Sequence, residues 1–419
     1  MKLPEFREIR QRFDAPVVED IAGTTGEEVS RMIEETGLRP GATVAVATGS
    51  RGIGNIATIV GSVVSALGRA GLKPFVVPAM GSHGGATSEG QRRVLENYGI
   101  SEAATGCPIR SDIDPASLGE TADGLPVYLD RNALGADHIV VVNRVKPHTD
   151  FKGSVGSGLM KMLAIGLGKQ KGASYYHGAV FEYGFEHMIT TVSDHVLRHA
   201  PVAFGLAIIE NAYDRTAHIV GVPARVLQQE ERRLFQEAQR LMPRLPSDDI
   251  DILIVDEMGK NISGTGMDTN IIGRRMQNFE TEPAIPRILR IIVRDLTPES
   301  EGNAVGIGLA DFTTRRLVDK INHRYTYVNS ITGMSPQKSR IPVFLDTDRE
   351  VIEAAFSTIG MKPPGDGRAV RIKNTLSLGR IAVSDALAEE IAGREDIEIS
   401  GERASLEFDG HGTLGALPR

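Results

Sequence analysis

Apolar positions along the first half of the chain alternate between short continuous runs and helical spacing. Residues 43–47 (TVAVA) form one continuous apolar run, and residues 55–70 carry apolar side chains at intervals of three and four. The first pattern is typical of a buried strand and the second of a helix. The pattern then predicts a strand at 75–77, a helix at 87–98, and strands at 139–142 and 206–209. Fully apolar strands that alternate with helices favour a parallel sheet covered on both faces.

A polar helix rich in Glu, Gln and Arg is predicted at 224–241, and Pro243 follows it. Because proline cannot continue a helix, we place a domain boundary here. A second α/β alternation follows, with apolar runs at 250–255, 288–293 and 305–309. The sequence therefore predicts an α/β fold of two α/β domains, residues 1–245 and 246–419. We expect the first to hold a mostly parallel sheet covered by helices, with the active site in the interdomain cleft.

Composition and charge restrict the possible partners of this 419-residue chain. Its formal net charge is −7 and no basic block is present, so we expect neither nucleic acid nor an anionic membrane as a partner. No apolar run reaches the roughly 18 residues of a membrane span, and the charged start does not resemble a signal peptide. We therefore expect a cytoplasmic protein. Cys107 is the single cysteine and allows neither an intramolecular disulfide nor a cysteine metal cage.

Three side chains suited to catalysis follow predicted strands. Arg51 lies shortly after the first strand, His83 after the second and His148 after the third. Ligands of open parallel sheets bind at the carboxyl ends of strands, so these side chains are expected at one edge. Arginine binds carboxylates through its planar fork, and histidine transfers protons near neutral pH. Taken singly, His83 could be a turn residue, His148 a loop cap, and Arg51 a surface charge or phosphate clamp.

A lysine in apolar surroundings follows these residues. Lys161 stands among Leu, Met and Ala, directly after the glycine- and serine-rich stretch 153–158. A semi-buried lysine is unfavourable unless it is neutralised, paired or used covalently, although it could also extend its amine to solvent from a helix start. His177 follows sixteen residues later. On its own, His177 could equally be a hydrogen-bonded core or loop histidine.

The order and near-spacing of the four side chains from His83 to His177, with Arg51 ahead of them, resemble a known signature. It is that of the nickel-dependent lactate racemase family. The resemblance covers the whole chain length and is strongest over residues 43–180. It implies an isomerase, a racemase or epimerase of 2-hydroxy acids.

The resemblance also implies a cofactor, the nickel-pincer nucleotide, a pyridinium mononucleotide that gives nickel two sulfur ligands and one carbon ligand. Such a cofactor fits a chain without a cysteine cluster. It would take a hydride from C2 of a small-molecule 2-hydroxy acid and return it to the other face. The enzymes that make the cofactor are then expected partners, while the oligomeric state is left open.

Residue roles carry over from the resemblance one position at a time. Lys161 corresponds to the lysine that binds the cofactor covalently, and His177 to the protein ligand of nickel. His83 and His148 correspond to the acid–base pair, and Arg51 to an arginine that positions the substrate. The other positions at which we expect cofactor contacts are Ser50, Arg51, Gly156 and Gly158.

In the second domain, Glu257 and Lys260 correspond to the family's Gln-x-x-Lys, and we expect both to contact substrate. A glutamate near an anionic substrate disfavours a second carboxylate and accepts hydrogen bonds from hydroxyl groups. This favours a hydroxylated substrate such as a sugar acid. Alternatively, Glu257 pairs with Lys260 or Arg274 and does not meet the substrate.

Two other functions stay open. The segment from Thr48 to Gly54 is one residue short of the TGxxxGxG loop of short-chain dehydrogenases, so an NAD-dependent hydroxy-acid dehydrogenase is one alternative. None of the eight tyrosines has a lysine four residues later, which argues against it. The other alternative is a non-catalytic carrier of nickel or cofactor, which would not need two acid–base histidines.

Overall fold

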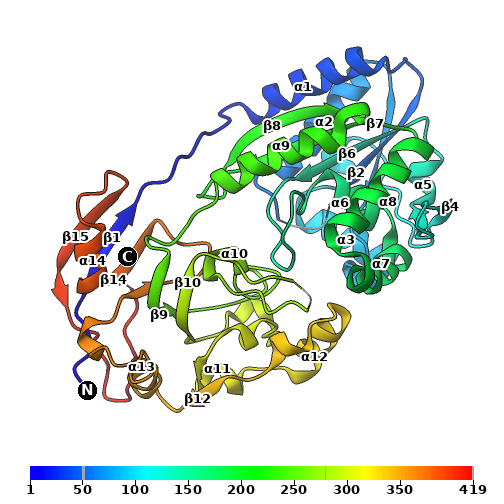
Figure 1. Ribbon diagram of the computed structural model, residues 1–419. Helices are drawn as coiled ribbons and strands as arrows, with labels where there is room; N and C mark the ends of the chain where they lie inside the picture. Colours follow the sequence, from blue (N-terminus) through cyan, green and yellow to red (C-terminus); the bar gives the residue numbers. More distant parts are fainter. Residues whose placement is uncertain (50–51, 279, 418–419) are drawn as a thin grey trace. The chain divides into compact units, whose positions relative to one another are not determined.

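The computed structural model describes residues 1–49, 52–278 and 280–417, and the chain divides into two compact units (Figure 1). The N-terminal unit contains Ala15–His148 and Lys152–Met242. The C-terminal unit contains Met1–Asp14, Thr149–Phe151 and the chain from Pro243 onward. The main border therefore lies just before the proline that ends the polar helix.

The sheet of the N-terminal unit has the strand order β3-β2-β6-β7-β8. Neighbouring strands pair in parallel, except β7 and β8, which pair antiparallel. The strands are β2 (Thr43–Thr48), β3 (Lys73–Pro78), β6 (His138–Arg144), β7 (Val202–Glu210) and β8 (Thr216–Pro223). A separate antiparallel hairpin is formed by β4 (Ala116–Glu120) and β5 (Pro126–Leu129). The expected α/β fold with a mostly parallel sheet is confirmed.

Helices of this unit pack their apolar stripes on the sheet and on one another. In α2 (Ile56–Arg69), buried side chains such as Ile59, Val60, Val63 and Leu67 recur at helical spacing and share one core with Val46 of β2. The other helices are α1 (Ile21–Thr36), η1 (Gly84–Ala86), α3 (Ser88–Asn97), α4 (Glu102–Thr105), α5 (Arg131–Leu134), α6 (Leu159–Lys161), η2 (Met162–Gly166), α7 (Lys169–Tyr183), α8 (Phe185–His199), η3 (Ala224–Val226) and α9 (Leu227–Arg240).

The C-terminal unit is built on a mixed sheet with the order β12-β11-β10-β9-β13-β14-β1-β15. Its strands are β1 (Phe6–Gln11), β9 (Asp249–Val255), β10 (Arg287–Val293), β11 (Phe312–Thr314), β12 (Val343–Leu345), β13 (Ala369–Ile372), β14 (Arg380–Ser384) and β15 (Ile397–Ala404). The strands from β12 to β13 pair in parallel, and the rest pair antiparallel. Its helices are α10 (Thr269–Ile272), η4 (Pro298–Ser300), η5 (Ile307–Leu309), α11 (Arg315–Asp319), α12 (His323–Thr332), η6 (Pro336–Ser339), α13 (Asp348–Phe356), η7 (Pro364–Asp366) and α14 (Asp385–Ile391).

Two short segments of the first expected domain pack with the C-terminal unit. Strand β1 lies between β14 and β15 and pairs with both, as Figure 1 shows for the blue strand beside the orange and red ones. The segment Thr149–Phe151 joins this unit because Thr269 donates a hydrogen bond to the carbonyl of Thr149 and Lys338 pairs with Asp150.

One expected apolar run is not a strand. Residues 305–309 form a turn that leads into the short 3-10 helix η5, and the third parallel strand of this unit is β11 instead. Gly306 has φ of +98°, which side chains rarely adopt, and an added Cβ would lie 1.7 Å from the carbonyl oxygen of Thr265. This glycine therefore marks a tight turn within the apolar run.

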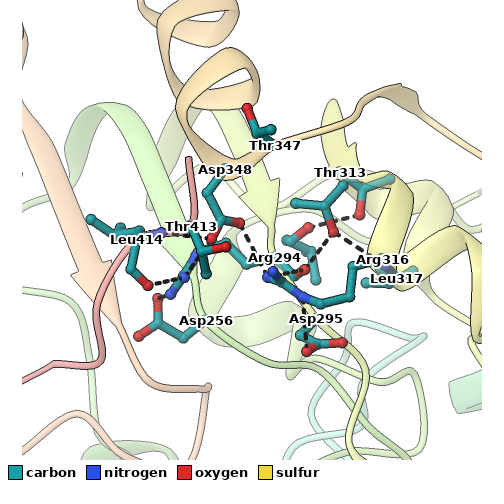
Figure 2. A network of polar contacts seen from close by, with 12 residues as sticks. Asp256, Arg294, Asp295, Thr313, Arg316, Leu317, Thr347, Asp348, Thr413 and Leu414 are labelled. Carbon is teal, nitrogen blue, oxygen red and sulfur yellow. Dashed lines mark hydrogen bonds and ion pairs between the residues drawn. The ribbon is translucent and has the colours of Figure 1, made fainter. Parts of the chain in front are cut away.

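Buried ion pairs connect residues at the ends of neighbouring strands in the C-terminal unit (Figure 2). Arg294 follows β10 and is 6% exposed, and its guanidinium lies 2.7 Å from carboxylate oxygens of both Asp256 and Asp348. Asp348 also accepts a hydrogen bond from the backbone N–H of Leu414 at 2.9 Å. The network thus binds the end of the chain to the sheet.

Among the described residues, no helix is both long and apolar enough to cross a membrane.

Candidate active site

The segments that carry His83 and His148 leave the sheet on either side of one strand. Strand β2 is central to this edge, with β3 on one side and β6 on the other. The chain therefore runs from β2 to one neighbour and later returns to the other, which makes the carboxyl end of β2 a topological switch point. Ligands of open α/β sheets bind at such points. His83 follows β3 and His148 follows β6, so both segments start at this edge.

The end of β2 contacts the segment that leads to Lys161. A Cβ on Gly49 would lie 3.1 Å from Oδ1 of Asn143 on β6. The amide of Asn143 in turn donates a hydrogen bond of 3.0 Å to the carbonyl of Gly158. Ser50 and Arg51, expected to contact cofactor and substrate, lie outside the described residues, and their roles stay predictions.

The turn that carries His83 packs on the segment after Lys161. The backbone N–H of Gly81 donates to the carbonyl of Gly166 at 3.1 Å, and that of His83 donates to the carbonyl of Met80 at 3.1 Å. Gly81 has φ of +56°, and a Cβ there would lie 3.3 Å from the side chain of Ala173. Glycine is therefore required both by the backbone conformation and by this close packing. His83 is left partly exposed.

His148 is also partly exposed, and its ring centroid lies 5.0 Å from that of Phe185. The chain just before it pairs with the glycine-rich stretch, because Lys146 and Ser157 exchange two backbone hydrogen bonds of 2.8 Å. A Cβ on Gly156 would lie 2.4 Å from the carbonyl oxygen of Lys146. Gly156 therefore has a packing role at this crossing, and its expected cofactor contact stays a prediction.

Lys161 ends α6 and is followed directly by a π-helix, η2. The wider turn is closed by the N–H of Leu167, which donates to the carbonyl of Met162 at 2.8 Å. π-Helical turns are rare and occur frequently at functional sites. Lys161 is partly exposed, and its amine lies 3.4 Å from Oγ of Ser157. His177 is partly exposed on α7, the next helix along the chain.

Glu231, which sequence reasoning missed, is fully buried beneath the start of α6. Its Oε2 accepts a hydrogen bond of 2.7 Å from the backbone N–H of Met160. Burial raises the pKa of Glu231 to about 7, although the backbone N–H groups at Met160 and Leu159 oppose that rise. A Cβ on Gly158 would lie 2.1 Å from Oε1 of Glu231. Gly158 thus leaves room for this carboxyl group, and its expected cofactor contact is untested.

A further ion pair joins neighbouring strand ends. Arg144 at the end of β6 pairs with Glu210 at the end of β7, and Glu210 is 7% exposed in its side chain. The same carboxylate accepts a hydrogen bond of 2.6 Å from the N–H of Gly54, in the loop that follows β2. The pair therefore holds the backbone at Gly54, shortly after β2. The sequence could have indicated this pair, because Arg144 and Glu210 are charged residues at the ends of apolar strands.

Glu257 and Lys260 lie in the C-terminal unit. The carboxylate of Glu257 accepts a hydrogen bond of 2.9 Å from Asn374 and lies 3.6 Å from the amine of Lys373. The amine of Lys260 donates to the carbonyl of Gly264 and, at 2.8 Å, to Oδ1 of Asn329. The partners of Glu257 in the structure, Asn374 and Lys373, therefore differ from the pairing with Lys260 or Arg274 considered from the sequence. Its contact with substrate stays a prediction.

Within the described ranges, no group of three or more His, Cys, Asp and Glu side chains could hold a metal ion. The two side chains expected to hold cofactor and nickel, Lys161 and His177, are one amine and one imidazole, on α6 and α7 of the N-terminal unit. Such a set fits a metal whose remaining ligands belong to an organic cofactor. It would not fit a metal held by the protein alone, which ordinarily takes three or four side chains.

The N-terminal unit is similar in sequence to a known protein family. Residues 35–187 match the family described as lactate racemase N-terminal domain. This range includes β2, β3 and β6 and all four side chains from His83 to His177. The N-terminal unit is therefore similar to that domain, over 153 of the 419 residues of the chain.

Two solved structures share the fold across both units. One is the lactate racemase apoprotein from Thermoanaerobacterium thermosaccharolyticum, with a TM-score of 0.53 and 12% identity, over 88% of this chain and 94% of that one. The other is a protein from Thermotoga maritima, with a TM-score of 0.54 and 11% identity, over 87% and 99% of the two chains. A sequence comparison with curated proteins gave no match. The similarity to the lactate racemase N-terminal domain supports a function of the racemase or epimerase type, and the two solved structures show the fold alone.

Proposed function

We propose that this protein is a 2-hydroxy-acid racemase or epimerase that works with a nickel-pincer nucleotide. The observation that carries the proposal is the arrangement at the carboxyl end of β2. The His83 turn and the His148 segment leave the two strands that flank β2, and both segments pack against the stretch that carries Lys161. The segments that carry the side chains proposed for proton transfer and for cofactor attachment therefore start at or pack against one edge of one sheet.

Lys161 and His177 are the side chains that would hold the cofactor. Lys161 is partly exposed and its amine, beside Ser157, can form a covalent bond, and the imidazole of His177 can bind nickel. When bound, the cofactor supplies the acceptor and donor for the hydride at C2 of the substrate. The protein's own residues bind the substrate, orient it and move the hydroxyl proton.

His83 and His148 would act as the acid–base pair. An imidazole takes up and releases protons near neutral pH, so either ring can accept the hydroxyl proton of the enantiomer that it faces. The other ring then returns a proton to the carbonyl oxygen when the opposite enantiomer forms. Both histidines are therefore needed in each direction.

The substrate carboxylate would be held by Arg51 and by Lys260, as a planar fork and a point charge respectively. We propose a hydroxylated substrate of the sugar-acid type, because Glu257 accepts hydrogen bonds and repels a second carboxylate. The hydrogen bond from Asn374 and the ion pair with Lys373 both involve Oε1 of Glu257, so such hydroxyl groups would bind at Oε2.

The test is a racemisation assay on protein produced together with the cofactor-making enzymes. Loss of optical rotation is followed for single enantiomers of lactate, malate, phenyllactate and aldonic acids. His83→Gln and His148→Gln should each slow both directions by about 10²–10⁴-fold. His195→Gln, on α8 outside these segments, is the matched control. A variant of either site histidine that keeps wild-type rates in both directions would refute the pairing.

A further inference from the structure

A fully buried lysine, Lys169, lies between Lys161 and His177 in the sequence. Lys169 is the first residue of α7, eight residues before His177, and its side chain is 1% exposed. Its φ of +55° lies in the left-handed region, three residues after the π-helix η2 ends. Burying an ammonium group is costly unless it is paired, so a side chain of this kind needs a structural or functional reason.

The partners of Lys169 come from three segments of the N-terminal unit. Its amine lies 2.8 Å from Oδ2 of Asp130, which is itself fully buried. It donates a hydrogen bond of 2.6 Å to the carbonyl of Pro78, the last residue of β3, and one of 3.3 Å to Oε1 of Gln91 on α3. Burial lowers the pKa of Lys169, and the charge of Asp130 opposes that change.

Gln91 connects this ion pair to the turn that carries His83. The amide is fully buried, and its Nε2 donates to the carbonyl of Gly81 at 2.9 Å and to the carbonyl of His83 at 3.4 Å. The amide is therefore held by Lys169 at its oxygen, and holds the turn with its nitrogen. The turn is thus fixed at its start through Pro78 and at its centre through Gln91.

We propose that Lys169, paired with Asp130, is a positioning residue that fixes His83 through Gln91 and fixes the start of the helix that carries His177. This rests on the proposed function, because it assigns His83 its acid–base role. One buried ammonium group then sets the spacing between the proton-transfer turn and the helix of the metal ligand. A displacement of about 1 Å in such a group can cost 10²-fold in rate.

The decisive variant is Gln91→Glu, which keeps the shape and the acceptor facing Lys169 but loses both N–H donors. Its matched control is Gln11→Glu in the C-terminal unit. Gln11 is also buried, and its amide also donates to two backbone carbonyls, those of Leu378 and Arg244. Both variants lose the same type of contact, but only one contact supports His83.

Hydrogen–deuterium exchange of the full-length protein without cofactor gives the first measurement. Gln91→Glu should speed exchange in residues 79–87 at least tenfold, and Gln11→Glu should leave these residues unchanged. Lys169→Met should loosen the first turn of α7 as well. If Lys169→Met does not fold, the comparison of Gln91→Glu with Gln11→Glu tests the proposal by itself. Unchanged exchange in residues 79–87 of Gln91→Glu, or equal acceleration in Gln11→Glu, would overturn the proposal.

The second measurement separates positioning from general stability. In protein carrying the cofactor, Gln91→Glu should lower kcat by about 10–100-fold while KM changes less than about threefold, because the proton-transfer group is displaced and substrate contacts are not. A faster exchange with an unchanged kcat would overturn the proposal. Failure of the wild type to racemise any 2-hydroxy acid would instead refute the proposed function, while the exchange result would still report on the turn.

Discussion

Glu231 lies directly beneath Gly158, so that a Cβ atom on this glycine would come within 2.1 Å of Oε1 of the carboxyl group. The other oxygen, Oε2, accepts the N–H of Met160, one residue before Lys161. Oε1 itself has no hydrogen-bond partner among the residues that the structure describes, and it can carry a proton. The segment that holds Lys161 is therefore built over a buried carboxyl group, which gives it two measurable properties.

The first property is a pH dependence of stability. The pKa of Glu231 is about 7 in the folded protein, against about 4.3 for an unperturbed glutamate. Between these values the folded protein holds a proton that the unfolded chain releases. The stability that Glu231 contributes is therefore fully present below about pH 4.3 and is lost as the pH rises through about 7.

Glu231→Gln removes this titration. Its free energy of unfolding, compared with that of the wild type, should rise by roughly 3 kcal/mol between pH 5 and pH 8. Urea titrations at several pH values give this difference. Glu230→Gln is the control, because it removes a partly exposed carboxylate that pairs with Arg233 on the same helix. A difference between Glu231→Gln and the wild type that does not change with pH would show that this carboxyl group is not the source.

The second property is intolerance of a side chain at position 158. Gly158→Ala forces its Cβ against the buried carboxyl group and should cost about 1–3 kcal/mol in the free energy of unfolding. Gly61→Ala is the matched control, because an added Cβ there meets no atom within 4 Å in the middle of α2. That variant should gain about 0.5–1 kcal/mol. Equal stability of the two variants would contradict the packing described here.

Much of the sheet was predictable because its strands are buried on both faces. A run such as 139–142 has no polar face, and apolar side chains then follow one another without interruption. Strand β1 was missed for the opposite reason. It is antiparallel, reads FREIRQ with charged side chains at the exposed positions, and pairs with strands almost 400 residues away along the chain. Local patterning carries no information about such distant partners.

The sequence points to candidate site residues where a polar side chain follows a strand end, and not where a buried polar group packs beneath the candidate site. His83 and His148 stand out because each comes after an apolar run. Lys169 lies in the stretch GKQKGA, which looks like an exposed turn, so its burial has no local signature. Glu231 did leave a signal, since it occupies a position on the apolar stripe of α9 that also contains Leu227 and Leu234.

The buried ion network of the C-terminal unit should be sensitive to loss of one partner. Asp348→Ala leaves Arg294 with an incompletely compensated buried charge and should cost about 3–5 kcal/mol in the free energy of unfolding. Asp346→Ala is the matched control, because its side chain is 68% exposed and pairs with Arg315 at the surface. It should change stability by less than about 1 kcal/mol. Thermal unfolding compares the two, and a similar small effect in both would mean that the network does not stabilise the unit.

Cofactor attachment gives a direct test of Lys161 and His177. Intact mass spectra of protein produced beside the cofactor-making enzymes should show an adduct, which Lys161→Ala abolishes. His177→Ala should keep the adduct but lose nickel on dialysis, because the imidazole is the proposed protein ligand. Lys171→Ala, which removes an exposed lysine from the same helix as His177, should behave as the wild type does. An adduct and normal nickel content in all three variants would assign the cofactor to other residues.

The racemisation of one enantiomer labelled with deuterium at C2 tests the proposed reaction most directly. Protein carrying the adduct is incubated in ordinary water with each labelled 2-hydroxy acid. The two enantiomers are then separated, and the deuterium content of each is measured by mass spectrometry. We predict that the second enantiomer of at least one sugar acid forms and keeps its deuterium, because the hydride returns to the carbon it left. If no opposite enantiomer forms, or if it forms with hydrogen from solvent at C2, the protein is not a racemase of the proposed kind.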